Sequence, residues 1–461
     1  MIDTVSEQRL EQCSGFLASQ MGLYFPRERW LDLLRALERM APTLGLENSA
    51  AAIEWLLNTP LDQQRIEIIA SYLTVGETYF YREPAVFAAL ENQILPDLIS
   101  ARRAEGRRQL RIWSAGCCSG EEPYSIAMLL SRLLPDLEQW NITLLATDIN
   151  PQFLAKARQG EYRDWSFRGT PDWMRNGYFE AGVAGSARVI AHIRRLVHFD
   201  YLNLMDDAYP ALDNHTNAMD IVFCRNVLMY FQSDAMQAVL EKIRRALIDG
   251  GWLVISPTEA SARMRALFTP VGFTDAMLYR KDERQPAAQA WPLLDIVTRW
   301  TPPPLEVPPA IDARAEPRPL PTVQPAPEPA QTPSTLALAA RACANRGQLD
   351  EAYRCCTEAI AHDKLNPGLR YLLASILTEQ GRHAPAANAL KQALYLDQNH
   401  VLAHFALGNC YRRQEQMEAS SRHFAHAREL LAHYAPEHLL PDADGLSAGR
   451  LLEIINHQEK R

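Results

Sequence analysis

The chain has 461 residues, of which 47% are hydrophobic and 22% are charged, and its formal net charge is −8. This length predicts two or three domains, and the acidic balance gives no general reason to expect nucleic-acid binding. Neither an apolar run long enough for a bilayer nor a signal peptide is recognisable, so we expect a cytoplasmic protein without membrane insertion.

The N-terminal region, residues 1–76, has the pattern of an all-helical domain. Leu31, Leu34, Leu37 and Ala41 recur at helical spacing between residues 6 and 75, and Ile53 begins a second such stripe. The spacing predicts amphipathic helices throughout this region.

Residues 110–280 alternate strand patterns with helix patterns, which predicts a parallel α/β sheet with right-handed crossovers. An Asp249-Gly250-Gly251 turn predicts a helix end followed by a new strand. Residues 160–195 are expected to form a less regular excursion. The expected strands are 110–114, 142–147, 196–199, 220–224, 252–256 and 276–280, and the expected helices are 123–134, 151–159 and 235–247.

The first of these strands runs into a turn of small residues that includes Gly116 and Gly120, and a helix pattern begins at Glu121 and Glu122. Glycines let a ligand approach the backbone, and a helix start offers free N–H groups to it. Two carboxylates would repel a pyrophosphate, and the turn is not G-x-G-x-x-G. A ligand with hydroxyls and positive charge fits better, and S-adenosylmethionine has both. For Glu121, interaction with the helix dipole is an equally good explanation.

Two further strand ends add polar groups to the same edge of the predicted sheet. Asp148 follows the second strand, where it can accept hydrogen bonds from ribose hydroxyls. Arg225 and Asn226 follow an apolar strand and are costly there unless they face a cleft at its carboxyl end. Tyr230 follows a few residues later, and its hydroxyl needs a partner if buried.

The eight cysteines show neither zinc-ligand nor redox C-x-x-C spacing, and the histidines form no metal-ligand pattern. We therefore expect no metal and reduced thiols. The vicinal pair Cys117–Cys118 lies in the ligand turn, where buried inert thiols are favoured over an oxidation-sensitive pair.

Residues 285–334 are expected to be a proline-rich linker, because 12 of the 30 prolines lie between Pro302 and Pro333. A 34-residue period follows, typical of tetratricopeptide repeats. The period predicts three helix pairs over residues 335–432 and a capping helix around 448–459 within the tail 433–461. A generic helical bundle would not explain four coincident registers of mostly small residues, which are Gly347/Gly381/Glu415, Ala340/Ala374/Gly408, Ala352/Ala386/Ser420 and Ala359/Ala393/Ala427.

The glycine-rich segment 112–126 resembles the signature of the CheR-type chemotaxis-receptor methyltransferases, and four further segments resemble that family in the right order. The resemblance implies a Rossmann-like class I S-adenosylmethionine-dependent methyltransferase domain over residues 77–284, following the N-terminal helical domain. By their match to the family's motifs, the cofactor-binding residues are Thr78, Arg82, Gly116, Glu122, Asp148, Asn203, Leu204, Arg225 and Asn226, and the catalytic residues are Arg82 and Tyr230.

The chain departs from the family pattern at two places. Gly76 stands where the family typically has an asparagine, so one cofactor contact is missing. At Ser256-Pro257-Thr258-Glu259 the family often has Gly-His-Ser-Glu, and only the glutamate is shared.

The implied reaction esterifies glutamates on the cytoplasmic helical domain of a methyl-accepting chemoreceptor-like protein, with S-adenosylhomocysteine as product. Arg82 would orient the substrate carboxylate and Tyr230 would line the methyl path. A small β-insert and a basic helix face around Arg29 and Arg35 would grip the receptor, although a solvated face explains those arginines equally well. The repeats would bind another, unidentified protein. Two alternatives remain: a scaffold that binds the cofactor only structurally, and a small-molecule methyltransferase.

Overall fold

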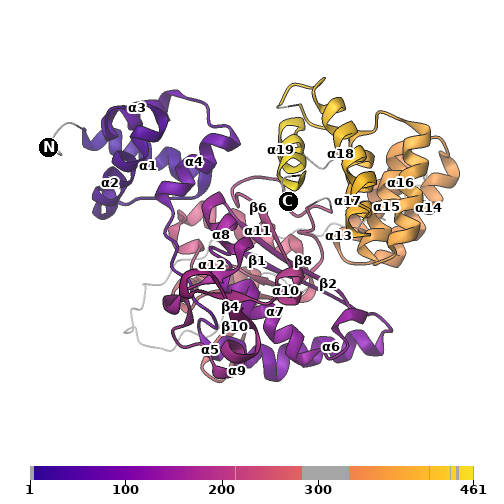
Figure 1. Ribbon diagram of the computed structural model, residues 1–461, viewed down its shortest axis with the longest axis horizontal. Coiled ribbons are helices and arrows are strands. Elements are labelled where there is room, and N and C mark those ends of the chain that lie inside the picture. The colour runs from indigo at the N-terminus through magenta and orange to yellow at the C-terminus, as the bar shows by residue number, and fades with distance from the viewer. Residues whose placement is uncertain are drawn as a thin grey trace, which may run out of the picture.

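The computed structural model describes residues 5–282, except 213, and residues 332–459, except 415, 437 and 443–445. Residues 285–331 of the expected linker therefore lie outside the described residues. Glu415, a member of one repeat register, lies outside them too. Figure 1 shows the described part as a helical N-terminal region, a central α/β region and a C-terminal stack of helices.

The N-terminal region is all-helical, as its spacing predicted. Its first, third and fourth helices are capped by side chains of Ser6, Asn48 and Asp62, which accept hydrogen bonds from backbone N–H groups. Of the predicted stripe over α2 and the residue after it, Leu37 and Ala41 are buried, but Leu31 is 49% exposed and Leu33 is buried in its place. The helices are α1 (Glu7–Met21), α2 (Trp30–Met40), α3 (Ser49–Asn58) and α4 (Gln63–Leu73).

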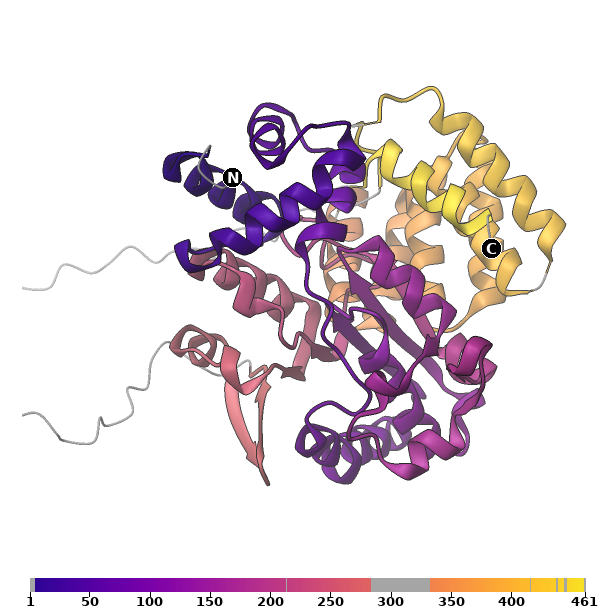
Figure 2. The ribbon, with the colours of Figure 1, turned by 60° about the vertical axis from the view of Figure 1, so that its left-hand side comes forward.

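The central region contains a seven-stranded sheet among the described residues, in the order β6-β2-β1-β7-β8-β10-β9. The first five strands of this order are parallel, and β10 and β9 are antiparallel. Figure 2 shows β9 and β10 projecting from the sheet as a hairpin. The strands are β1 (Gln109–Ala115), β2 (Asn141–Asp148), β6 (Val197–Tyr201), β7 (Met219–Phe223), β8 (Leu247–Val254), β9 (Thr269–Phe273) and β10 (Ala276–Arg280).

Alternating side chains of the buried strands fill a separate core on each face of the sheet. Ile112 packs in the core of one face and its neighbour Trp113 in the core of the other, as the two-residue period of a strand requires. Helices that cover the first face are α5 (Pro84–Ala89), α6 (Leu95–Ala104), α7 (Glu121–Leu133), α8 (Pro151–Gln159) and α10 (Ala191–Leu196), and those that cover the second are α11 (Ser233–Ala246) and α12 (Ala262–Leu267).

One local prediction was wrong and another agrees with the structure. The Asp249-Gly250-Gly251 segment lies inside β8, which starts at Leu247, and the positive φ of Gly250 accommodates the irregular register there. Residues 160–195 form the less regular excursion that was expected, with short elements that include α9 (Asp172–Gly177) and a small antiparallel sheet of β3 (Glu161–Tyr162), β5 (Ala187–Val189) and β4 (Phe179–Ala181).

The C-terminal region is the stack of helix pairs that the 34-residue period predicted. Ala359, Ala393 and Ala427 of one register are fully buried, because a small residue is needed where neighbouring helices cross closely. The capping helix also forms where it was expected. The helices are α13 (Pro333–Asn345), α14 (Leu349–His362), α15 (Pro367–Glu379), α16 (His383–Leu396), α17 (Val401–Arg413), α18 (Met417–Leu431) and α19 (Ala448–Glu459).

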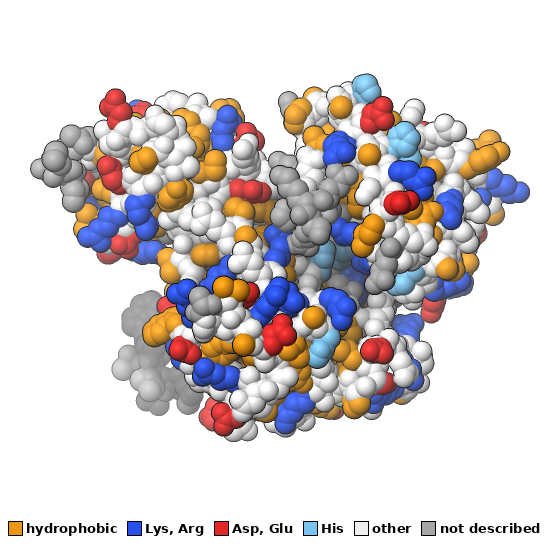
Figure 3. All heavy atoms as spheres, viewed as in Figure 1, with side chains coloured by type: hydrophobic (Ala, Val, Ile, Leu, Met, Phe, Trp, Pro, Cys, Tyr) orange, Lys and Arg blue, Asp and Glu red, His pale blue; other side chains and the backbone are white. Residues whose placement is uncertain are grey.

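The repeats are docked on the edge of the sheet where the parallel strands begin. Glu379, at the end of α15, forms a buried ion pair with Arg111 of β1, and its Oε1 lies 3.0 Å from Nδ1 of His215. Its backbone oxygen accepts hydrogen bonds from Gln109 at 2.8 Å and Asn141 at 3.1 Å. On the face shown in Figure 3, a notch separates the repeats from the N-terminal helices. The repeats are thus fixed to the α/β region at the opposite end of the strands from the cavity described next.

Candidate active site

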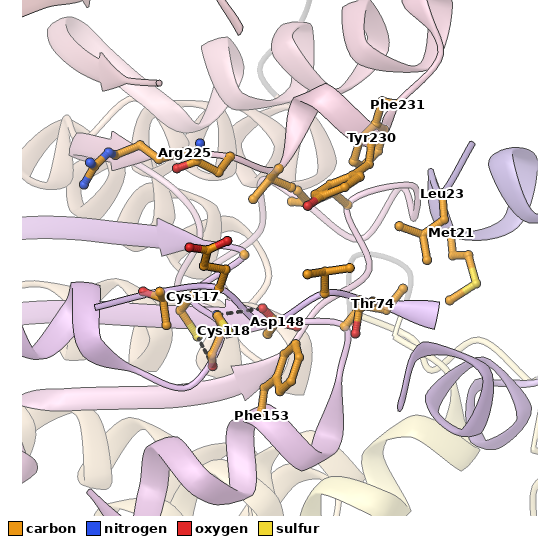
Figure 4. A pocket seen from close by; sticks show the side chains of 18 of the residues that line it. Met21, Leu23, Thr74, Cys117, Cys118, Asp148, Phe153, Arg225, Tyr230 and Phe231 are labelled. Carbon is orange, nitrogen blue, oxygen red and sulfur yellow. Dashed lines mark hydrogen bonds between the residues drawn. The ribbon is translucent and has the colours of Figure 1, made fainter. Parts of the chain in front are cut away.

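A cavity of about 1140 Å³, part of it open to solvent, lies at the carboxyl ends of β1, β2 and β7 and is closed on one side by the N-terminal region. Figure 4 shows Met21 and Leu23 of that region facing Tyr230 and Phe231 across it, with Asp148 and Phe153 on the floor. All the cofactor-binding and catalytic residues that were predicted from the sequence line this cavity. They are Thr78, Arg82, Gly116, Glu122, Asp148, Asn203, Leu204, Arg225, Asn226 and Tyr230.

Gly116 sits at the tightest point of the turn after β1. Its φ is +75°, and a Cβ atom there would come within 2.3 Å of Cγ2 of Val227. Its N–H donates to the carbonyl of Thr147, which ties the turn to β2. Only glycine combines this backbone conformation with so close a neighbour.

Arg225, which is buried, pairs with the partly exposed Glu122 in the cavity wall. Nη1 of Arg225 lies 3.1 Å from Oε2 of Glu122, whose other oxygen accepts a hydrogen bond from Ser114 at 2.7 Å. Nη2 of the same arginine contacts Glu83 at 3.2 Å and donates to the carbonyl of Arg82. Arg225 is thus held by two carboxylates and joins β7 to the segment before α5.

Asp148 is buried at the end of β2 and accepts hydrogen bonds from two backbone N–H groups, those of Cys118 and Asn150, each at 2.8 Å. Burial raises its pKa to about 6, although these hydrogen bonds act in the opposite direction. The free lone pairs of its oxygens can accept from ligand hydroxyls.

Asn226 carries the clearest sign that a ligand is required. Its Oδ1 is buried and has no hydrogen-bond partner among the described residues, and its backbone has a positive φ of 58°. Buried polar atoms are almost always satisfied, so an unpaired one in a cavity wall indicates a donor supplied from outside the chain.

Glu259, whose role the sequence did not reveal, holds the loop that carries Asn226. Its carboxylate accepts four backbone hydrogen bonds, from Asn226, Val227, Met229 and Ser256, at 2.7–3.2 Å. Burial raises its pKa despite these four donors. The glutamate shared with the family pattern at 256–259 therefore acts through the backbone. The family pattern pointed to this residue, but nothing in the sequence showed that it binds backbone N–H groups.

The N-terminal region contributes the remaining wall. The backbone N–H of Tyr24 donates to the carbonyl of Tyr230 at 2.9 Å, and the guanidinium of Arg29 lies 5.9 Å from the centre of the Tyr230 ring. Asn203 donates from its side chain to the carbonyl of Gln20 at 2.8 Å. Arg29 lines the cavity, which brings one member of the predicted basic face to this site.

Arg82 projects from the segment that crosses from the N-terminal region into the α/β region. Its Nη1 donates to the backbone oxygen of Glu77 at 2.8 Å, and no carboxylate among the described residues pairs with it. Its neighbour in the chain, Glu83, contacts Arg225 instead.

The glycine at position 76 has a direct physical explanation. A Cβ atom there would lie 2.5 Å from Cζ of Phe153 and 3.3 Å from Sγ of Cys118. The Phe153 ring, from the start of α8, thus occupies the space that an asparagine side chain would need.

Glu121, Cys117 and Cys118, which neighbour the site residues in this turn, have structural roles. The carboxylate of Glu121 is buried and accepts hydrogen bonds from Ser119 and Ser166, so it points away from the cavity. Burial raises the pKa of Cys118 to about 12 and that of Cys117 as well, which keeps both thiols protonated and unreactive at neutral pH.

Comparison with known proteins places this geometry in a family. Residues 76–277 match the family described as the SAM-binding domain of the CheR methyltransferases, and residues 344–400 match a tetratricopeptide repeat. Chemotaxis protein methyltransferase 2 of Vibrio cholerae is 35% identical over 221 residues, which are 48% of this chain and 75% of that protein. The chain belongs to the CheR methyltransferase family.

Two further relatives extend the likeness. A probable chemotaxis protein methyltransferase of Rhizobium etli is 32% identical over 56% of this chain and 94% of its own length. The probable biofilm formation methyltransferase WspC of Pseudomonas putida is 31% identical over 369 residues, 76% of this chain and 83% of that protein. As the sequence predicted, this chain is an S-adenosylmethionine-dependent methyltransferase that also carries tetratricopeptide repeats.

The cavity of this CheR-family enzyme fits S-adenosylmethionine. Asp148 offers acceptors for hydroxyls, the unpaired Oδ1 of Asn226 offers one for an ammonium group, and Gly116 lies in the cavity wall beside them. No group of three His, Cys, Asp or Glu side chains in the described residues is placed to hold a metal ion. None of the described helices has the length and apolarity to cross a bilayer.

Proposed function

We propose that this enzyme methylates glutamate carboxylates on the cytoplasmic helical domain of a chemoreceptor-like protein and releases S-adenosylhomocysteine. Membership of the CheR family and the names of relatives as chemotaxis protein methyltransferases support the proposal. We assign cofactor binding to Thr78, Arg82, Gly116, Glu122, Asp148, Asn203, Leu204, Arg225 and Asn226, and catalysis to Arg82 and Tyr230.

The observation that carries the proposal is the contrast between two arginines in one cavity. Arg225 is neutralised by Glu83 and Glu122, whereas Arg82 has no acidic partner among the described residues and still lines the cavity. A cation left unpaired beside the cofactor site suits a substrate that brings its own carboxylate.

The methyl transfer requires little acid–base catalysis from the protein. Bound S-adenosylmethionine supplies an electrophilic methyl group. A glutamate carboxylate is already ionised near neutral pH, so no general base is needed. Arg82 orients the incoming carboxylate, Tyr230 lines the path of the methyl group, and Met21, Leu23 and Phe231 exclude water from it.

The product removes a negative charge from a receptor helix and thereby shifts its signalling equilibrium. The repeats, in this proposal, bind a second protein of the pathway, and the enzyme works in the cytoplasm at membrane-bound receptors. The likeness to WspC, a relative named for biofilm formation, suggests a pathway that controls surface growth.

The test uses full-length protein, radiolabelled S-adenosylmethionine and membranes that carry the cell's own receptor-like proteins. We expect label in the receptor band that is released by base as methanol. Arg82→Ala should reduce labelling at least a hundredfold, or about 2.7 kcal/mol, while Arg108→Ala, a matched change at the far edge of the sheet, should leave it unaltered.

Two results would favour the alternatives. Cofactor binding without any labelled receptor would favour a scaffold that uses the cofactor structurally. Labelling of small carboxylic acids that exceeds receptor labelling would favour a small-molecule methyltransferase.

A further inference from the structure

The chain folds part of its own C-terminal region onto the face formed by the first helix of each repeat. The carboxylate of Asp442 lies 3.4 Å from Nη2 of Arg341 on α13 and 3.9 Å from Nε2 of His400, the N-cap of α17. It also lies directly over Gly368 at the start of α15. One carboxylate therefore meets all three repeats at once.

The segment that carries Asp442 is held on both sides. Before it, Leu440 is buried in the core of the repeats, and its N–H donates to the carbonyl of Leu446 at 3.0 Å. After it, the N–H of Ala448 donates to the carbonyl of His438 at 2.8 Å, just before α19. Asp442 itself has a φ of 63°, a turn conformation that Asp and Asn adopt more readily than most residues.

The surface beneath this carboxylate is shaped for it and offers it one cation, Arg341. A Cβ atom on Gly368 would come within 2.5 Å of Oδ2 of Asp442, so glycine leaves the space that the carboxylate fills. An arginine, a histidine and a glycine gap around one acid are the features of a carboxylate subsite.

We propose that this face is the partner-binding site of the repeats, that it recognises a short acidic peptide, and that the chain's own Asp442 segment occupies it as an internal competitor. The partner peptide presents a carboxylate two residues after an apolar side chain, as Leu440 and Asp442 do. Binding requires that the internal segment leave. The inference rests on the partner-binding role proposed above for the repeats and is independent of methyl transfer.

The internal segment lowers the apparent affinity for the partner. A site that is free in only a fraction of molecules binds more weakly by that fraction. A change that weakens the internal contact should therefore strengthen binding of a peptide added in solution, which is the opposite of what loss of a structural contact would do.

The experiment measures fluorescence anisotropy of a labelled peptide with the sequence of residues 436–449, added to the full-length protein. Asp442→Lys places a cation beside Arg341 and should increase affinity at least tenfold over the unmodified protein. Glu429→Lys, the same change at an exposed acid of α18, should not. A peptide with Asn in place of the aspartate of position 442 should bind at least tenfold more weakly to the Asp442→Lys protein.

Gly368→Ala separates the two halves of the proposal. Alanine is the better helix former, so the repeats should stay folded, but its methyl group fills the subsite. Hydrogen exchange at the amides of Leu440 and Ala448 should accelerate in this variant and in Asp442→Lys, while the peptide should bind only to Asp442→Lys.

Each contrary outcome overturns the proposal. Slow exchange at Leu440 in Asp442→Lys would show that the carboxylate does not hold the segment. Fast exchange without a gain in peptide affinity would show that the exposed face is not a site for acidic peptides. Receptor methylation is measured separately, so either failure leaves the proposed enzymatic function untouched.

Discussion

The two ends of the parallel strands bury similar chemical groups and treat them differently. At the amino end, Glu379 is enclosed by Arg111, His215 and the side chains of Gln109 and Asn141, so its charge and backbone oxygen are both satisfied. At the carboxyl end, Arg82 has no acidic partner and Asn226 keeps an unpaired oxygen among the described residues. A closed polar network holds two parts of one chain together, whereas an incomplete one indicates a missing ligand.

The largest expected effect is on stability, at the amino end of the strands, where the polar network around Glu379 is complete. Burial by itself raises the pKa of Glu379, but the charge of Arg111 and the hydrogen bond with His215 lower it below its ordinary value. Glu379→Gln leaves Arg111 charged and buried, which should lower the free energy of unfolding by about 3–5 kcal/mol. Urea unfolding followed by circular dichroism measures this.

Arg111→Gln combined with Glu379→Gln should recover part of that loss, because no buried charge is then left alone. Glu358→Gln, at an exposed acid of α14, serves as the control. A double variant no more stable than the single one would show that the charge pair does not determine the docking.

The turn that contains Gly116, at the carboxyl end of the strands, should be nearly as sensitive to substitution. There the effect is on ligand binding and not on stability. Gly116→Ala forces Val227 away and with it the loop of Asn226, so the dissociation constant for S-adenosylhomocysteine should rise about a hundredfold, or about 2.7 kcal/mol. Calorimetric titration measures it.

Gly106→Ala is the matched control for that change. Gly106 has a similar φ of +69°, but nothing lies within 4 Å of where its Cβ would be. It carries the same backbone strain without the collision, so its binding constant should stay unchanged. Equal losses in both variants would assign the effect to strain alone.

Asp148 gives a smaller, pH-dependent effect. Its pKa of about 6 lies above the ordinary value of 3.8, so the carboxylate gains a proton as the pH falls through 6 and then loses acceptor capacity. Affinity for S-adenosylhomocysteine should be constant above pH 7 and fall up to about tenfold per unit below pH 6. The Asp148→Asn variant should bind S-adenosylhomocysteine weakly at every pH, with no dependence of affinity on pH. The Asp172→Asn variant should keep the pH dependence of the unmodified protein.

Position 76 gives the smallest change. Gly76→Asn collides with Phe153 and should weaken S-adenosylhomocysteine binding about fivefold, an overpacking cost of about 1 kcal/mol. Adding Phe153→Ala should restore affinity, because the asparagine then has room. A double variant weaker than Phe153→Ala alone would show that the ring does not replace the asparagine.

The sequence predicted the residues that line the cavity at the carboxyl end of the strands. It did not predict the contact between Glu379 and Arg111 at the amino end. Glycines, acids and an Arg-Asn pair at successive strand ends leave a pattern because a ligand constrains their order along the chain. Glu379 stands at a helix end and Arg111 inside a strand, and nothing in the spacing of a single sequence connects residues so far apart. Glu259 was missed similarly, since it acts on backbone N–H groups that any sequence carries.

The small-residue registers of the repeats were predictable for a related reason. Helix crossings demand small side chains at fixed intervals, so Ala352 and Ala386 mark them in the sequence. The place where the stack meets the sheet has no such period and depends on the fitted shapes of both parts.

The docking of the repeats on the sheet also changes what the covalent connection between residues 283 and 331 has to do. Because Glu379 and Arg111 already fix the relative position of the two parts, the intervening chain serves mainly to raise the effective concentration of one for the other. If a protease cut the chain between residues 283 and 331, we expect the two parts to stay associated as a non-covalent pair through this buried contact.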